Sequence, residues 1–145
     1  MPKALAFMPP PEPNLGRVNG FVLIKFLGKG TFGSVYQVRR EEDGKIYAMK
    51  KVDTRKMTAK ERAEAVNEIR VLASVAGDQV ITFYEAFVEA DVLYIVTEFA
   101  THGDLFAYLK TARRRGHLPE ETVWSMFIQM CLGVRTLHDK NIMRA

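Results

Sequence analysis

Three glycines with the spacing GxGxxG lie between two stretches that have the composition of β-strands. The sequence LGKGTFGSVYQV places them at Gly28, Gly30 and Gly33. Glycine at such positions allows the backbone to approach a phosphate chain closely, because a side chain would block the approach. The residues that follow, SVYQVRR, are typical of a strand, so the loop leads into a second strand and not into a helix. A hairpin over a phosphate ligand is one interpretation of these glycines, and a flexible hairpin turn is the other.

The rest of the chain predicts a sheet around this hairpin. Five runs are rich in β-branched and aromatic residues and are separated by turn signals or by a helix, at residues 21–28, 34–40, 45–52, 80–89 and 93–100. The segment between the third and fourth runs has a helical period instead. These signals predict an α+β fold in which a five-stranded antiparallel sheet carries one major helix.

The major helix is expected at residues 58–75. It opens at Thr58 and has Glu61 three residues later, which is the pattern of a capping box. Gly77 is expected to end the helix. Leu72 is expected to face the core.

After the fifth strand the sequence becomes helical. A short helix is expected at residues 104–110, a basic loop at 111–117 and a long helix at 119–138, with Pro119 in its first helical position. The arginines at residues 113–115 of the basic loop are compatible with a substrate or phosphate patch, although a solvated loop is the favoured interpretation.

Composition excludes several other classes of protein. The net charge is +4, but the basic residues are interleaved with 17 acidic ones, so no nucleic-acid binding is expected. No run has the length of a signal peptide or a membrane span, which predicts a cytoplasmic protein without membrane insertion. The single cysteine, Cys131, excludes an intrachain disulfide and is expected to be packed in the core. Residues 1–19 are rich in proline and are expected to be a disordered tail, with a docking role for PPPEP as the alternative.

The hairpin and the strand that follows it resemble sequences of protein kinases. LGKGTFGSVY followed by YAMK is similar to the kinase glycine-rich loop and the lysine of the third strand. This resemblance implies that Lys50 holds the α- and β-phosphates of ATP and that Val35 and Ala48 line the adenine, in addition to packing in the core. A mobile lysine needs an anchor, and the stretch NEIRVL resembles the family register with Glu68 as that partner.

A second stretch, LYIVTEFATHGDL, resembles the kinase hinge. The resemblance implies that main-chain groups of Glu98 and Ala100 hold the adenine and that Thr97 guards the back of the pocket. It also implies that Asp104 meets the ribose hydroxyls. His102 stands where many relatives carry a second glycine and is expected to be a solvated surface residue.

Within the kinases, the sequence most resembles the NIMA-related serine/threonine kinases, over residues 21–143. This implies a kinase N-lobe at residues 20–100 and the first helices of a C-lobe at 101–145. It also implies ATP and Mg²⁺ as cofactors, and a parent molecule that phosphorylates protein substrates. Cytoskeletal, centrosomal or ciliary locations follow from the family resemblance.

The family's catalytic loop HRDxxxxN and its metal-binding DFG segment do not occur in the 145 residues, which end NIMRA. We therefore expect this polypeptide by itself to lack the catalytic base and the metal ligands, and to be inactive as a kinase. The alternative function is a catalytically empty lobe that serves as a scaffold or regulatory binding module.

The long helix at 119–138 is apolar on nearly all sides, which is typical of a buried helix. Its apolar residues are Val123, Trp124, Met126, Phe127, Ile128, Met130, Cys131, Leu132, Val134 and Leu137. We expect a protein partner, self-association or the rest of a C-lobe to cover it.

Overall fold

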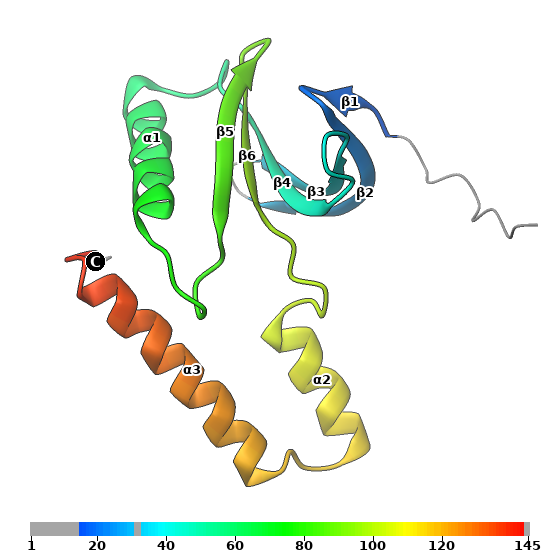
Figure 1. The fold of residues 1–145 in the computed structure, drawn as a ribbon, viewed down its shortest axis with the longest axis vertical. Coiled ribbons are helices and arrows are strands. Elements are labelled where there is room, and N and C mark those ends of the chain that lie inside the picture. Colours follow the sequence, from blue (N-terminus) through cyan, green and yellow to red (C-terminus); the bar gives the residue numbers. More distant parts are fainter. Residues whose placement is uncertain (1–14, 31–32, 144–145) are drawn as a thin grey trace, which may run out of the picture.

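The computed structural model describes residues 15–30 and 33–143. Figure 1 shows a curled sheet with one helix beside it and two further helices extending away from it. The strands are β1 (Arg17–Val18), β2 (Phe21–Gly30), β3 (Gly33–Arg40), β4 (Ile46–Asp53), β5 (Phe83–Glu89) and β6 (Val92–Glu98). The helices are α1 (Ala59–Ser74), α2 (Leu105–Arg115) and α3 (Glu120–His138).

The sheet is antiparallel and its strand order is β1-β2-β3-β4-β6-β5. The predicted α+β class is confirmed, but the sheet has six strands instead of five. The additional strand is β1, which has only two residues and is too short for any periodic signal. It lies within residues 1–19, the range expected to be a tail, so that prediction was wrong for residues 17–18; residues 1–14 lie outside the described residues.

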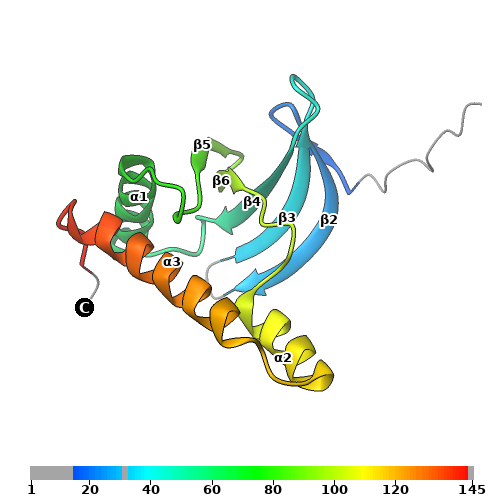
Figure 2. The same ribbon diagram turned by 60° about the horizontal axis from the view of Figure 1, so that its bottom comes forward.

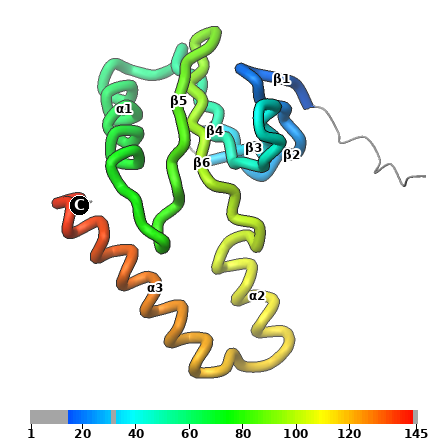
Figure 3. The backbone as a smooth tube through the Cα atoms, in the orientation of Figure 1, coloured from blue at the N-terminus to red at the C-terminus, as the bar shows by residue number. Residues whose placement is uncertain are grey.

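The two faces of the sheet carry two apolar clusters. On one face, Tyr47 and Met49 of β4 pack with a cluster that includes Phe21, Val38 and Val96. The other face carries a smaller cluster of Val52, Leu93 and Ile95, and α1 packs against it through Ala65 and Ile69. Figure 3 shows α1 beside β5 at this side of the sheet. Side chains alternate between the two faces along β4, so Ala48 and Lys50 lie on the same face as the smaller cluster.

Helix α1 begins as predicted. The Thr58 side chain accepts a hydrogen bond from the Glu61 N–H, and the Glu61 carboxylate accepts one from the Thr58 N–H, so the capping box is confirmed. The predicted end at Val75 is confirmed to within one residue, but the predicted stop at Gly77 was wrong. The helix stops at Ser74, and Val75 caps it in an extended conformation, with its N–H bonded to the Leu72 carbonyl.

Gly77 has a different role from the helix stop that was predicted. A Cβ atom at Gly77 would lie 3.4 Å from Thr136 Cγ2 of α3, an ordinary contact distance, so Gly77 lies where the loop after α1 meets that helix. Gly133 is the one residue of α3 that is buried, and a Cβ there would lie 3.0 Å from the Gln79 carbonyl. Gly77 and Gly133 thus lie where α3 meets the loop between α1 and β5.

Helix α2 is longer than expected. Asp104 caps its N-terminus by accepting a hydrogen bond from the Ala107 N–H at 2.7 Å, and the helix continues to Arg115. The basic loop predicted at residues 111–117 was therefore wrong up to Arg115, because arginine and alanine are good helix formers. Gly116, with φ of 125°, caps the end.

Helix α3 matches the expected range, with Pro119 as its N-cap residue instead of its first helical residue. Cys131 is exposed, so its predicted burial was wrong. Figure 2 shows that the C-terminal end of α3 returns to the side of α1. None of the helices in the described part of the chain combines the length and the apolar character that a membrane crossing requires.

Candidate nucleotide-binding site

The glycine hairpin joins β2 and β3, and its tip at residues 31–32 lies outside the described residues. Gly30 pairs with Gly33, and Gly28 pairs with Val35. A Cβ atom built on Gly33 would lie 2.0 Å from the Lys51 carbonyl oxygen, which no real side chain tolerates. The fold itself therefore requires glycine at this position.

Gly28 and Gly30 have no such requirement. A Cβ atom on Gly28 would meet nothing within 4 Å, and one on Gly30 would meet only the Gly33 carbonyl oxygen at 3.9 Å. Neither position shows a left-handed backbone conformation. The packing of the chain does not explain these two glycines, whereas a ligand that approaches the backbone closely would.

The sheet register brings several of the predicted residues onto one face. Gly28 is paired with Val35, Val35 with Lys50, and Lys50 with Ile95, so these four form a row across β2, β3, β4 and β6. Directly paired residues of antiparallel strands share a face. Ala48 lies two residues before Lys50 and pairs with Thr97. A continuous surface therefore runs from the hairpin to the end of β6, with small side chains around one lysine.

Lys50 meets Glu68 of α1 at the edge of this surface. Lys50 Nζ lies 3.6 Å from Glu68 Oε1, and the two side chains are 31% and 51% exposed. The capping box sets where α1 begins, and Glu68 lies on a helix face that turns toward the sheet. An exposed ion pair of this kind contributes about 0 to 1 kcal/mol to stability. Its main physical effect is to hold the lysine ammonium in one place.

The segment after β6 supplies main-chain groups beside the same surface. The Glu98 N–H donates to the Thr82 carbonyl at 2.8 Å, and Thr97 Oγ1 lies 3.4 Å from the Glu98 carbonyl oxygen. The Ala100 N–H has no hydrogen-bond partner among residues 15–30 and 33–143, although its carbonyl accepts from the Gly103 N–H at 3.4 Å. A donor that the protein leaves unused at this point is available to a ligand.

Asp104 and His102 lie further along this segment. One oxygen of Asp104 caps α2, a local role that the sequence analysis missed although an aspartate before a helical run is a recognised N-cap signal. His102 is exposed, and its Nδ1 lies 3.1 Å from Thr101 Oγ1.

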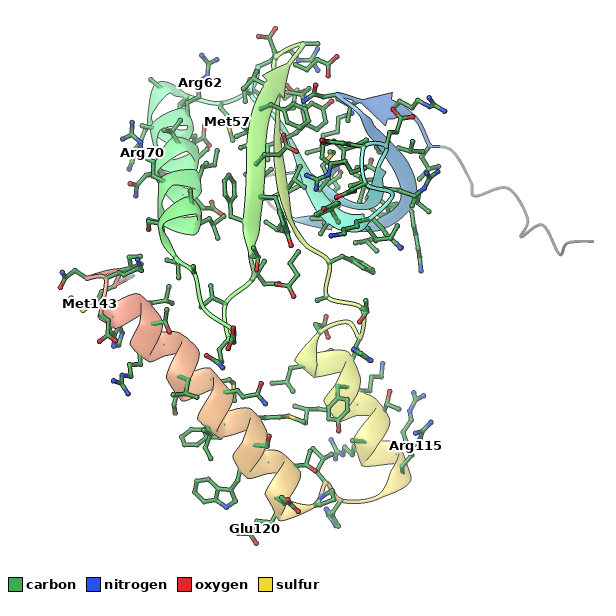
Figure 4. All side chains as sticks on the ribbon, in the orientation of Figure 1. Met57, Arg62, Arg70, Arg115, Glu120 and Met143 are labelled. Atoms are coloured by element: carbon green, nitrogen blue, oxygen red, sulfur yellow. The ribbon has the colours of Figure 1, made fainter. Side chains whose placement is uncertain are left out.

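A cavity of about 320 Å³ lies between α1 and the sheet, next to the ion pair. Its apolar walls include Met57, Leu93 and Ile95, and its polar lining includes Asn67 and Glu64. Figure 4 shows Met57 near the start of α1 and Met143 at the opposite end of that helix. Glu61, Ala65, Glu68 and Val71 also line the cavity, and their helical spacing in the sequence is the signal for this inner face of α1.

Metal ligands form no cluster here. The described part of the chain contains no group of three or more His, Cys, Asp or Glu side chains that could hold a metal ion. No residue of this chain is therefore assigned to Mg²⁺.

Comparison with known proteins matches the sequence of this chain to a family. The protein kinase domain family matches residues 21–144, and the chain belongs to that family. Its relatives include mouse serine/threonine-protein kinase Nek1, which is 32% identical over 123 residues, or 85% of this chain and 10% of the relative. Mouse serine/threonine-protein kinase Nek9 is 35% identical over 125 residues, covering 85% of this chain and 12% of the relative.

A third relative is the probable serine/threonine-protein kinase nek2 of Dictyostelium discoideum, which is 28% identical over 123 residues, or 83% of this chain and 29% of the relative. The similarity to NIMA-related kinases that the sequence predicted is confirmed. The chain spans 10% to 29% of the length of these three relatives.

Proposed function

We propose that this chain is the ATP-binding portion of a serine/threonine protein kinase, whose parent molecule transfers the γ-phosphate of ATP to serine or threonine residues of proteins. The observation that carries the proposal is the 3.6 Å approach of Lys50 Nζ to Glu68 Oε1, on the sheet face that also carries Gly28, where an added Cβ would meet nothing within 4 Å. A compact ammonium held in place can neutralise concentrated phosphate charge.

The other residues of the proposed site would contact either the adenine or the ribose of ATP. Val35 and Ala48 offer a flat apolar surface that admits a ring, and Thr97 limits its depth. Main-chain groups of Glu98 and Ala100 would hold the adenine edge, and the Ala100 N–H is the donor with no internal partner. Asp104 would meet the ribose hydroxyls with the carboxylate oxygen that does not cap α2.

Thermal unfolding with and without ATP tests the proposal. We expect ATP to raise the Tm of the wild-type chain by about 2 to 4 °C, which corresponds to weak binding. Lys50→Met should abolish the shift, because it removes the ammonium and keeps an unbranched side chain. Lys51→Met is the matched control, since Lys51 is the next residue of β4 and alternation places it on the opposite face.

Two results would contradict this assignment. One is a Tm that does not respond to ATP in the wild-type chain. The other is an equal loss of the Tm shift in Lys50→Met and Lys51→Met. That result would mean that ATP binding depends on positive charge in general and not on the lysine paired with Glu68.

We also propose that the 145-residue polypeptide has no kinase activity by itself. Its sequence contains no HRDxxxxN loop and no DFG segment, and the described residues offer no metal cluster. Loss of a general base alone lowers a rate by about 10² to 10⁴. Purified chain should not label a generic protein substrate above background in the presence of ATP and Mg²⁺. Clear ATP-dependent and Mg²⁺-dependent labelling, abolished by Lys50→Met, would refute this proposal.

A catalytically empty binding module is the second candidate function. The observation that favours it is the exposed apolar surface of α3, where Trp124, Phe127, Ile128 and Met130 are each at least half exposed. Such a patch marks a surface that another molecule covers. Sedimentation of the purified chain tests this candidate, which predicts self-association or capture of a partner. A monodisperse monomer in which α3 is ordered and exposed would contradict it.

A further inference from the structure

The C-terminal end of α2 concentrates positive charge. Arg113, Arg114 and Arg115 form the last turn of the helix, with Lys110 one turn before them and His117 just beyond the Gly116 cap. All five side chains belong to exposed residues. None of them has an ion-pair partner within residues 15–30 and 33–143. We call these five residues the basic end of α2.

Two of the nearest carboxylates in the sequence have other hydrogen-bond partners, and Glu121 lies beside Glu120 in the first turn of α3 without an ion pair to these cations among the described residues. Asp104 accepts from the Ala107 N–H at 2.7 Å at the opposite end of the helix. Glu120, across the bend from Arg115 in Figure 4, accepts from Trp124 Nε1 at 3.1 Å. Cations in a last turn do stabilise the helix through its dipole, but that effect does not require three consecutive arginines. The charge of the basic end is thus left largely uncompensated.

A shallow hollow of about 460 Å³ lies beside these cations. It is lined by His102, Ala107, Tyr108, Thr111, Ala112, Arg115, His117 and Leu118. The lining contains no carboxylate. Its nitrogen and hydroxyl groups can donate hydrogen bonds, while the alanines and the leucine provide an apolar floor. Phe106, which is 76% exposed, adds an aromatic ring on the same helix.

We propose that the basic end of α2 and the adjoining hollow form a docking surface for an acidic peptide segment of a partner protein. Glutamate or aspartate side chains of the partner pair with the arginines, and one apolar side chain of the partner enters the hollow. The arginines lie at the end of α2 that is remote from the nucleotide surface, although His102 of the segment after β6 also lines the hollow. The docking surface therefore goes beyond the proposed function and does not depend on it.

The helix geometry favours a peptide over a flat anionic bilayer. Successive residues of an α-helix are rotated by about 100°, so three consecutive arginines fan out around the axis of α2 and cannot all face one plane. An extended peptide that crosses the end of the helix can reach them from different sides. The hollow also offers room for a side chain, which a lipid headgroup surface does not require.

Fluorescence anisotropy of the purified 145-residue chain tests the proposal. The probe is a fluorescein-labelled peptide in which glutamates surround a central leucine, and its control carries glutamine in place of every glutamate. The test variant is the triple Arg113→Gln, Arg114→Gln and Arg115→Gln. The matched control is Lys56→Gln, Arg62→Gln and Arg70→Gln, which removes the same charge from and near α1, where all three residues are exposed.

We expect the glutamate peptide to bind and the glutamine peptide not to bind. The α2 triple variant should weaken binding by about tenfold or more, and added salt should weaken it further. The α1 control variant should bind within about twofold of wild type. Circular dichroism should show equal helix content in both variants, so that loss of binding is not loss of α2.

Three outcomes would overturn the proposal. The first is no binding of the glutamate peptide by the wild-type chain. The second is an equal loss in the two triple variants, which indicates nonspecific attraction to net charge. The third is binding to vesicles of phosphatidylserine and phosphatidylcholine that depends on the three arginines, together with no peptide binding, which would assign the surface to a membrane. ATP and the Lys50→Met substitution should not alter peptide binding, so this test remains distinct from that of the nucleotide site.

Discussion

The sheet with α1 and the pair of helices α2 and α3 differ sharply in how they are packed. Among the described residues, the buried apolar side chains belong to the strands and to Val75 at the end of α1, and the four most completely buried are Phe21, Val38, Met49 and Val96. Helices α1 and α2 have no buried residue and α3 has only Gly133, but α1 packs its partly buried Ala65 and Ile69 against the sheet. One region has its own core, whereas the other exposes large apolar side chains along its length.

This difference indicates which region stabilises the fold and which region offers surfaces for binding. Burial of apolar area is the dominant favourable term in folding, so we expect the sheet and α1 to carry most of the free energy of unfolding. The two helices present surfaces instead, one apolar on α3 and one basic on α2. The proposed nucleotide surface lies on the well-packed side of this division, where the sheet positions Lys50 against Glu68.

The largest expected effect compares two phenylalanines across this division. Phe21 is 1% exposed and Phe127 is 51% exposed. Phe21→Ala should lower the free energy of unfolding by about 3 to 5 kcal/mol or prevent folding, because it leaves a cavity between β2 and its neighbours. Phe127→Ala should change it by less than about 1 kcal/mol. Urea unfolding followed by circular dichroism measures both, and similar losses would show that α3 shares a core with the sheet.

A smaller effect is expected from two glycines of the hairpin. Gly33→Ala should cost about 2 kcal/mol or more, because the new methyl group would collide with the backbone of Lys51. Gly28→Ala should cost less than about 0.5 kcal/mol, since the space there is open. Thermal unfolding gives the two stabilities. A severe loss of stability in Gly28→Ala would mean that this glycine serves the fold and not a ligand.

The helix caps of the two regions provide the next comparison. Thr58→Ala removes the cap of α1, and Asp104→Ala removes the cap of α2. Each should cost its helix about 1 kcal/mol. In Thr58→Ala the loss should appear in the global unfolding transition, because α1 packs on the sheet core. In Asp104→Ala it should appear as faster hydrogen exchange confined to the first turn of α2. A global loss of the same size in both variants would contradict the proposed division.

The smallest expected effect is a loss of stability at acid pH that arises from carboxylates of the sheet and α1. Hydrogen bonds from Arg55 lower the pKa of Asp53 from 3.8 to about 2, and the Thr58 N–H and hydroxyl lower the pKa of Glu61. A carboxylate with a lowered folded-state pKa adds stability above its unfolded pKa and loses that stability as the pH falls toward the folded value. Urea midpoints should therefore decrease between about pH 4 and pH 2, and less so in Asp53→Asn. An identical pH profile in that variant would exclude Asp53 as a contributor.

The sequence predicted the parts of this molecule that have strong local signals. Runs of β-branched and aromatic residues located the five long strands, and the capping box located α1. The pairing of Glu68 with Lys50 was implied by the resemblance of NEIRVL to the kinase register. The NIMA-related resemblance rested on several ordered motifs and was confirmed. The roles of the nucleotide-site residues stay predictions.

Other features depended on tertiary context and could not be predicted in the same way. β1 is defined only by its pairing with β2, and Gly77 lies in a loop that contacts α3 instead of capping α1. The charge of Arg113 to Arg115 suggested a loop, although their helix propensity and the Asp104 cap favour the observed helix. Cys131 lies in an apolar run, which predicted burial, but it is exposed. Composition alone cannot show whether another element packs against its face of α3.

The most direct test of the central claim is a double-mutant cycle on nucleotide affinity. ATP binding would be measured by calorimetry for wild type, Lys50→Met, Glu68→Gln and the double variant, with Lys51→Met as control. If the carboxylate acts by holding the ammonium in place, each single substitution weakens binding by about tenfold and the double variant is no weaker than Lys50→Met. Effects that simply add, or Glu68→Gln binding as tightly as wild type, would contradict the account.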